Sequence, residues 1–464
     1  MSALTSALRE AVDAKVGEGA SFGKREEVAL ELMNEAGRRC LEEDLQGIAD
    51  RHEEQVLIDD VLHRRHEPGE VTYHSLCGGL VVKRYTYRAV GERNAPTVVA
   101  MELEAGLMER ATPALAGRIC LGYAKTHSRS IEEDLRSSFR VPPSRSTIER
   151  IGKGLGKEAQ SAVARVEAYV RAGEQVPKEA VAVSIGLDRT SVPMEEDRMP
   201  GEPPATRRRK RTKPYERQAP APVDVNYRMA YVGTVSMTDK DGECLVGRRY
   251  AASASEGPQG ILRRMVADVR GALRQNPELE VGVMQDGAPE MWNLVRGALD
   301  GEPLVDSWRE GIDRYHLNKR LGEVLRVVES DEAQRKVQLE SWQDDFDTND
   351  ATIDDIETWL LDEIACRDGE EVETLNEHAT FIDNNKDRMR YARLREVGLP
   401  VGSGVTEGAC GTVVGDRAKG KGRRWRPEGL GAAFTLRGIY CSDRMPQFCK
   451  HLKRRYTARI RAAA

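Results

Sequence analysis

The chain has 464 residues, of which 32% are charged and 39% hydrophobic, and its formal net charge is -5. This length predicts two to four structural units, and the chain has no apolar run of the roughly 18–20 residues that a membrane span needs. Its eight cysteines include no CxxC pair, which argues against a zinc ribbon and a disulfide scaffold. Because the start also lacks the pattern of a secretion signal, we expect a cytoplasmic protein.

The net charge hides a strong asymmetry along the chain. Residues 414–464 contain 14 Lys and Arg but only 3 Asp and Glu, whereas residues 329–383 contain 19 acidic and 3 basic residues. The basic end is therefore suited to polyanions, and the acidic segment would repel them.

The first part of the chain predicts two regions. Residues 1–68 form a helical region, since apolar residues recur every three to four positions over 8–16 and 28–50. Residues 69–178 begin with a β-hairpin over 70–90, centred on Gly78 and Gly79, and continue with helices over 100–170. We expect this mainly helical part to bind DNA.

Residues 130–159 predict two helices joined by a short turn. Ser144 lies where the second helix would be capped, and Arg145 and Arg150 could face a phosphate. This is the outline of a helix-turn-helix DNA-binding motif. An ordinary helical hairpin explains the same pattern.

The pattern changes again in residues 179–328. A buried strand over 181–188 is followed by strands over 229–236 and 244–250, joined by a turn at 239–242. A helix (261–273), a strand (279–285), a helix (291–299), a strand (304–312) and a helix (315–328) follow. This order predicts an α/β core, with a mixed five-stranded sheet and helices on both faces.

Two insertions interrupt the predicted core. Residues 195–226 form a proline-rich basic loop between the first two strands, which reads equally as a DNA contact or as a solvated linker. Its basic run consists of Arg207, Arg208, Arg209, Lys210 and Arg211. Residues 329–389 form an acidic helical insertion, after which residues 390–445 complete the core and 446–464 form a basic tail.

Three carboxylates stand at informative positions. Asp188 ends the first predicted strand, Asp286 ends the fourth, and Glu407 follows the turn at residues 402–404. Carboxylates at the ends of adjacent strands converge at one edge of a sheet. Together they are typical of a site for Mg²⁺ or Mn²⁺, two of which can promote phosphodiester cleavage. Taken singly, each is also typical of a turn former or a helix N-cap.

Several segments resemble one known family. They are LDRTSV (187–192), QDGAPEMW (285–292), DRYHLNKRL (313–321) and residues 384–425, with their PVGSG turn and the basic run that follows. These segments resemble the catalytic half of bacterial insertion-sequence transposases of the Kra type. That family belongs to the DDE transposases, which have a ribonuclease-H-like core. The resemblance covers about residues 180–445 and is most specific over 388–425.

The resemblance implies roles for particular residues. Asp188, Asp286 and Glu407 match the triad that holds two Mg²⁺ or Mn²⁺ ions, with Glu407 supplied after a helical insertion. Asp313 and His316 lie beside the site in the resembling proteins, although a core or capping role also fits His316. Phosphate contact is the fitting role for a basic set made up of Arg417, Lys419, Lys421, Arg423 and Arg424.

The implied function is that of a DNA transposase, which cleaves the ends of its element and joins them to a target. Double-stranded DNA is then the partner, and a homodimer is expected because two ends must be handled together. Two alternatives stay open: a structure-selective nuclease on the same fold, and a catalytically silent DNA-binding derivative. Arg189 beside Asp188 departs from the family pattern, and no cysteine pair follows the hairpin, so no zinc is predicted.

Overall fold

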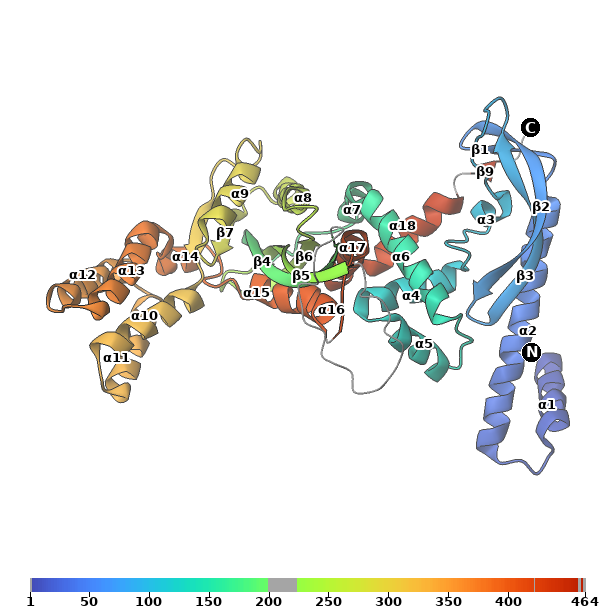
Figure 1. Cartoon of the computed structure of the whole chain (residues 1–464), viewed down its shortest axis with the longest axis horizontal. Helices are drawn as coiled ribbons and strands as arrows, with labels where there is room; N and C mark the ends of the chain where they lie inside the picture. Colours follow the sequence, from blue (N-terminus) through green and yellow to red (C-terminus); the bar gives the residue numbers. More distant parts are fainter. Residues whose placement is uncertain (1, 199–222, 421, 458–459, 462–464) are drawn as a thin grey trace. The chain divides into compact units, whose positions relative to one another are not determined.

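The computed structural model describes residues 2–198, 223–420, 422–457 and 460–461 (Figure 1). The chain forms two compact units: unit 1 comprises Met1–Val166 and Asp443–Ala464, and unit 2 comprises Glu167–Ser442. The C-terminal segment is therefore part of the N-terminal unit rather than a separate basic tail. Within the described residues, no helix has both the length and the apolar character needed to cross a membrane.

Unit 1 begins with two long helices that pack on one another, as the sequence predicts. They are α1 (Ser2–Val16) and α2 (Phe22–Arg51), and Arg25 of α2 forms an ion pair of 2.5 Å with Asp13 of α1. Helix α2 also covers an edge strand, where the Gln46 amide exchanges two hydrogen bonds of 2.9 Å with the backbone of Lys83. This contact satisfies backbone groups that an open sheet edge would leave unpaired.

A four-stranded antiparallel sheet follows, in the order β3-β2-β1-β9. It contains β1 (Gln55–Ile58), β2 (Val61–Ser75), β3 (Gly78–Ala89) and the C-terminal β9 (Ile460–Arg461). The predicted hairpin is confirmed, but the helical prediction for residues 55–68 is wrong. Val56 and Ile58 are buried while Leu57 between them is only half-buried, which is the alternation of a strand.

The rest of unit 1 is helical. It contains α3 (Ala100–Glu104), α4 (Pro113–Lys125), α5 (Ser128–Ser137), α6 (Arg145–Ser161) and α18 (Met445–Thr457), while α7 (Val163–Arg171) runs from unit 1 into unit 2. Ser144 caps α6 by accepting a hydrogen bond of 3.3 Å from the Thr147 amide, as predicted. Helices α4, α5 and α6 pack against one another.

Unit 2 contains a mixed five-stranded sheet in the order β6-β5-β4-β7-β8, which confirms the predicted arrangement. Strands β4 (Ala182–Asp197), β5 (Val223–Thr238) and β6 (Cys244–Ala252) are antiparallel. Strands β7 (Glu280–Gln285) and β8 (Arg309–Ile312) are parallel to β4. Parallel strands bring their carboxyl ends to one edge of the sheet.

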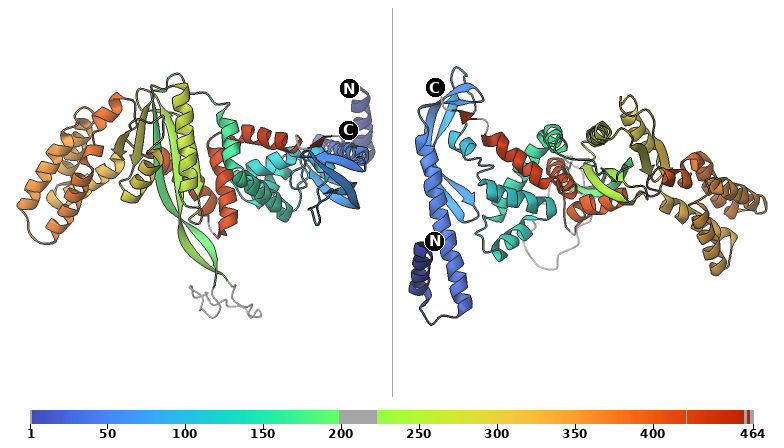
Figure 2. Two further views of the ribbon diagram at one scale, coloured as in Figure 1. Left: turned by 90° about the horizontal axis from the view of Figure 1, so that it is seen from above. Right: turned by 180° about the vertical axis from the view of Figure 1, so that it is seen from behind.

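Strands β4 and β5 are longer than the sequence pattern indicates. Strand β4 does not end at Asp188 but continues to Asp197, paired with β5 throughout. Beyond the other strands the two form a long twisted ribbon (Figure 2). Residues 195–197 and 223–226, predicted as loop, therefore belong to this ribbon, and the basic run 207–211 lies outside the described residues.

Helices cover both faces of this sheet. A Cβ at Gly233 would lie 2.3 Å from Met265 of α8 (Gln259–Gln275), whereas a Cβ at Gly186 would lie 2.0 Å from Thr406 of α15 (Gly404–Ala409). Each glycine therefore permits a helix to lie directly on the strands, on opposite faces. Helix α9 (Pro289–Leu299) follows β7 and contacts α8.

Two buried ion pairs connect α7 to α8. The Asp268 carboxylate accepts hydrogen bonds from Arg171 Nε, at 2.5 Å, and from the Tyr250 hydroxyl. Next to it, Glu167 accepts two hydrogen bonds of 2.9 and 2.6 Å from Arg264 Nε and Nη2. The two carboxylate side chains are each 3% exposed.

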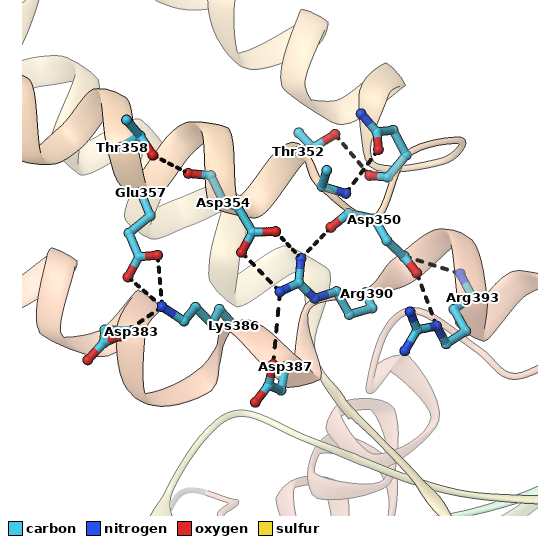
Figure 3. A network of polar contacts seen from close by, with 12 residues as sticks. Asp350, Thr352, Asp354, Glu357, Thr358, Asp383, Lys386, Asp387, Arg390 and Arg393 are labelled. Atoms are coloured by element: carbon cyan, nitrogen blue, oxygen red, sulfur yellow. Dashed lines mark hydrogen bonds and ion pairs between the residues drawn. The ribbon is translucent and has the colours of Figure 1, made fainter.

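The acidic insertion is helical, as predicted. Helix α10 (Arg314–Val328) leads into α11 (Glu332–Asp345), α12 (Thr352–Ala365) and α13 (Glu370–Asn385). A short turn of 3₁₀-helix (Lys386–Arg388) and α14 (Tyr391–Glu396) return the chain to the sheet. Bases from this return segment neutralise acids of the insertion: Arg390 pairs with Asp354 at 2.5 Å, and Lys386 with Glu357 at 3.0 Å (Figure 3).

The last part of unit 2 is a nearly continuous run of helix. Helix α15 passes into a π-helix (η2, Cys410–Gly415) and then into α16 (Asp416–Ala418), and α17 (Pro427–Cys441) closes the unit against β6. The π-helix is a rare form that occurs frequently at functional sites. Here it directly follows the turn that carries Glu407.

Candidate functional site

Three aspartates lie at one level across neighbouring strands. The β4–β7 ladder pairs Ile185 with Val283. Three residues further along, these two segments of the chain reach Asp188 and Asp286. The β7–β8 ladder pairs Gln285 with Ile312, and the next residues are Asp286 and Asp313. Continued past the last paired residues, the parallel register would place the three aspartates at one level, at the carboxyl ends of β7 and β8 and at the matching level of β4.

Glu407 approaches this row from the segment that covers the sheet. A Cβ at Gly282 would lie 2.4 Å from Leu399, and Thr406 hydrogen-bonds to Thr234 of β5 at 2.6 Å. The segment 399–406 therefore packs directly on β7 and β5. Glu407 is the next residue, and its side chain is exposed.

Cys410 joins Asp188 to the Glu407 helix. Its thiol lies one turn after Glu407 and donates a hydrogen bond of 3.1 Å to Asp188 Oδ2. Burial raises the pKa of the Cys410 thiol, and the negative charges of Asp188 and Glu407 raise it further, while Lys419 lowers it. The charges of Asp188, Glu407 and Lys419, all of which are predicted site residues, therefore act on the sulfur atom of Cys410.

The raised pKa makes a chemical prediction. At pH 8 we expect iodoacetamide to alkylate Cys410 much more slowly than the exposed Cys366, because only the thiolate reacts. Asp188→Asn removes a negative charge, so it should lower the pKa of Cys410 and speed its alkylation. Peptide mass spectrometry over a time course measures both rates. The Cys366 rate should stay the same in the variant, and equal rates for the two cysteines in the wild type would contradict the assignment.

Asp286 starts a tight turn between β7 and α9. Its Oδ1 accepts a hydrogen bond of 3.1 Å from the Ala288 amide, and Gly287 between them has a φ of +102°, which favours glycine. Arg189, the neighbour of Asp188, points away from the carboxylate and pairs at 2.6 Å with Glu290 in the first turn of α9. This ion pair ties β4 to the helix that follows the Asp286 turn.

The Asp313 carboxylate binds backbone amides of two segments. It is 2% exposed, caps α10 by accepting a hydrogen bond of 2.7 Å from the Tyr315 amide, and accepts one of 2.8 Å from the Ser403 amide. The Ser403 hydroxyl donates to the same carboxylate. Asp313 thus fixes the turn from which α15 and Glu407 begin. His316 is half-buried, with its ring 5.8 Å from that of Tyr315.

Asp313→Ala is expected to destabilise unit 2 by roughly 2–3 kcal/mol, because it removes a helix cap and leaves the Ser403 amide without its acceptor. The free energy of unfolding in urea, followed by tryptophan fluorescence, measures the loss. Asp313→Asn keeps an acceptor oxygen and should lose less. A stability equal to the wild type for Asp313→Ala would contradict the positioning role.

The predicted phosphate-binding residues have different surroundings. Arg417 is 3% exposed and its guanidinium lies 4.8 Å from the Trp425 ring, so in this arrangement little of it is open to a phosphate and the predicted contact stays a prediction. Lys419 is exposed and donates to the Thr190 hydroxyl, Arg423 binds backbone carbonyls of 416 and 417, and Arg424 is exposed. Lys421 lies outside the described residues.

The two arginines of the possible helix-turn-helix are both in ion pairs. Arg145 lies 3.3 Å from Glu132, and Arg150 lies 3.1 Å from Glu109. Their side chains remain about half exposed. A DNA phosphate would therefore have to compete with a carboxylate at each position.

Metal-binding geometry is not preformed here. Across the described ranges, no three side chains of Asp, Glu, His or Cys lie close enough together to hold a metal ion. The Asp188 carboxylate accepts from Cys410 and from the Arg189 amide, and that of Asp286 accepts from the Ala288 amide. Compared with known proteins, the chain matches no protein-family model and no curated protein sequence.

Proposed function

We propose that this protein is a DNA transposase, which cleaves and rejoins DNA strands by phosphoryl transfer at Asp188, Asp286 and Glu407, on a ribonuclease-H-like core. The observation that carries the proposal is the register that aligns Asp188 with Asp286, while the helix bearing Glu407 contacts Asp188 through Cys410. The π-helix after Glu407 and the sequence resemblance over residues 180–445 support the same reading.

Three carboxylates are the donor set that Mg²⁺ or Mn²⁺ prefers. Two such ions would activate the attacking oxygen and stabilise the leaving one. In the present arrangement Asp188 Oδ2 accepts from Cys410 and Asp286 Oδ1 accepts from the Ala288 amide, so the ions would share these oxygens with the present donors or displace them. Asp313 would take no part in holding the ions, because it is 2% exposed and accepts three hydrogen bonds, from the Tyr315 amide and from the Ser403 amide and hydroxyl.

Under this proposal, unit 1 binds the element ends, and the exposed basic residues near Glu407 contact phosphates regardless of sequence. Two ends must be held together, so the active form is a homodimer acting on double-stranded DNA in the cytoplasm. Binding should weaken steeply as salt rises, because bound cations are released when lysine and arginine neutralise phosphates.

The test uses the DNA that flanks the gene. Labelled fragments are incubated with purified full-length protein in Mg²⁺, in Mn²⁺ or in EDTA, and the products are resolved on a sequencing gel. Metal-dependent cuts at fixed positions in inverted repeats, followed by joining to a second duplex, support a transposase. Cuts at branched DNA irrespective of sequence indicate a structure-selective nuclease, and binding without cleavage indicates a silent DNA-binding derivative.

A further inference from the structure

A cavity of about 800 Å³ opens beside Asp286, at the carboxyl end of β7. It lies between the turn that follows Asp286, helices α9 and α10, and helix α13 of the acidic insertion. The residues that matter here are Asp286, Trp292, Arg320, Phe381, Asn384 and Arg388. The volume is in the range of pockets that hold one small organic ligand, about 300–1,000 Å³.

The insertion contacts the Asp286 turn through an aromatic ring. A Cβ at Gly287 would lie 3.0 Å from Cε2 of Phe381, so this glycine lets the turn rest directly on the ring. The guanidinium of Arg320 lies 3.9 Å from the centroid of the same ring. Arg320 has no carboxylate within ion-pair distance among the residues that the structure describes, so its charge is available to an anion.

Trp292 forms part of the inner wall of the cavity. The residue is 2% exposed and lines the cavity, and its indole N–H is buried without a hydrogen-bond partner. Two guanidinium groups hold the indole ring: those of Arg388, 4.8 Å from its centroid, and Arg296, 5.7 Å from it.

Those two arginines are fixed in place by Glu310. Arg296 Nε donates to Glu310 at 2.6 Å and Arg388 Nε at 2.8 Å. Burial would raise the pKa of Glu310, but hydrogen bonds from Arg296, Arg388 and Trp308 outweigh burial and lower it to about 2. The carboxylate therefore stays ionised at neutral pH, and the wall around Trp292 is rigid.

The insertion is acidic as a whole, yet it presents little of that charge to the cavity. Of the five lining residues on α13, only Glu377 is acidic; the others are Thr380, Phe381, Asn384 and Asn385. Amide side chains can pair with the edges of bases, and aromatic and guanidinium planes are surfaces on which bases stack. Arg320 supplies a guanidinium of the kind that binds phosphate.

We propose that this cavity binds one unpaired nucleotide of the DNA strand next to the phosphate presented at Asp286, with its phosphate at Arg320 and its base against Phe381 and the Asn384 amide. The proposal rests on the proposed function, which supplies DNA as the substrate. It also gives the acidic insertion a role: its helix α13 forms one wall of the substrate site, while its acidic outer surface repels DNA elsewhere.

Fluorescence anisotropy of a labelled single-stranded oligonucleotide of mixed sequence, and of its duplex, tests the proposal with full-length protein in EDTA. Arg320→Ala and Phe381→Leu should each weaken single-strand binding by about tenfold, the loss expected of a stacking or phosphate contact, and duplex binding much less. Phe381→Tyr keeps the ring and should bind as the wild type does. Lys336→Ala, on the exposed face of α11, is the matched control.

Unchanged single-strand affinity in both variants would overturn the proposal, and so would an equal loss for single strand and duplex. Competition by free deoxynucleoside monophosphates with no change in oligonucleotide affinity would instead make the cavity a small-molecule site. Urea unfolding of each variant checks its fold, and Arg320→Lys tests the charge with a milder substitution. Binding in EDTA is measured without cleavage. The binding test can therefore contradict the cavity proposal while the transposase proposal stands, and the cleavage test can contradict the transposase proposal while the cavity proposal stands.

Discussion

Asp188→Asn, Asp286→Asn and Glu407→Gln are each expected to lower metal-dependent DNA cleavage by about a thousandfold or more. The physical reason is that bound divalent ions contribute several kcal/mol to stabilising the charge of the transition state, and every 1.4 kcal/mol is a factor of ten in rate. Each substitution keeps the size of the side chain and removes one negative oxygen donor. The rate of single-turnover cleavage of a labelled DNA end measures the effect.

DNA binding by the same variants should persist under the proposed function, since the substitutions remove negative charges that would repel DNA. Glu278→Gln is the matched control: this exposed carboxylate lies in the turn before β7 and should leave the rate unchanged. Cleavage that survives all three substitutions would place the active site elsewhere. If only one or two of the variants lose cleavage, the carboxylates whose substitution has no effect would not belong to the triad.

The second large effect concerns stability. Asp268→Ala should destabilise unit 2 by roughly 3–5 kcal/mol, because it leaves the Arg171 guanidinium buried without its partner and takes away the acceptor of the Tyr250 hydroxyl. The midpoint of urea unfolding, with its slope, gives the free energy. All five tryptophans, at 292, 308, 342, 359 and 425, lie in unit 2, so their fluorescence reports on this unit.

Glu280→Ala is the comparison for that experiment. Glu280 also pairs with an arginine, Arg309 at 3.3 Å, but both side chains are about 40% exposed. Exposed ion pairs contribute about 0–1 kcal/mol, so the loss should be small. If the two substitutions cost the same, burial would not be what makes the Asp268 pair matter.

Much of unit 2 could be predicted because its elements follow simple periodicities. The strand β7 and the helices α8, α9 and α10 occur within two residues of their predicted bounds, whereas β8 (Arg309–Ile312) is much shorter than the predicted strand over 304–312. The length of β4 was not predicted, because the polar stretch 189–191 and Pro193 are typical of a strand end, although Val192 and Met194 prove to be buried. The strands at 55–68 were missed for a different reason: their many charged residues fit an exposed helix equally well, and the alternation of Val56, Leu57 and Ile58 is too short to stand out.

The site was predicted less completely than the fold. Asp188, Asp286 and Glu407 were predicted from strand ends, a turn and a resemblance, although β4 continues past Asp188. The contact of Cys410 with Asp188 was not predicted, because a single cysteine in a helix carries no signal. Gly186 and Gly282 did carry one: glycine inside a buried strand indicates that another segment lies very close. Neither Arg320 nor Phe381 could be placed, since the cavity depends on how an insertion packs.

The pairing of β9 with β1 sets an order of events during synthesis. Unit 1 is interrupted by the 276 residues of unit 2, so its last strand is made only after unit 2 is complete. At 5–20 residues per second this takes roughly 14–55 s. During that interval the free edge of β1 is open to wrong partners, including another nascent chain. A ribosome that stalls within unit 2 would release a chain whose N-terminal sheet still lacks its closing strand.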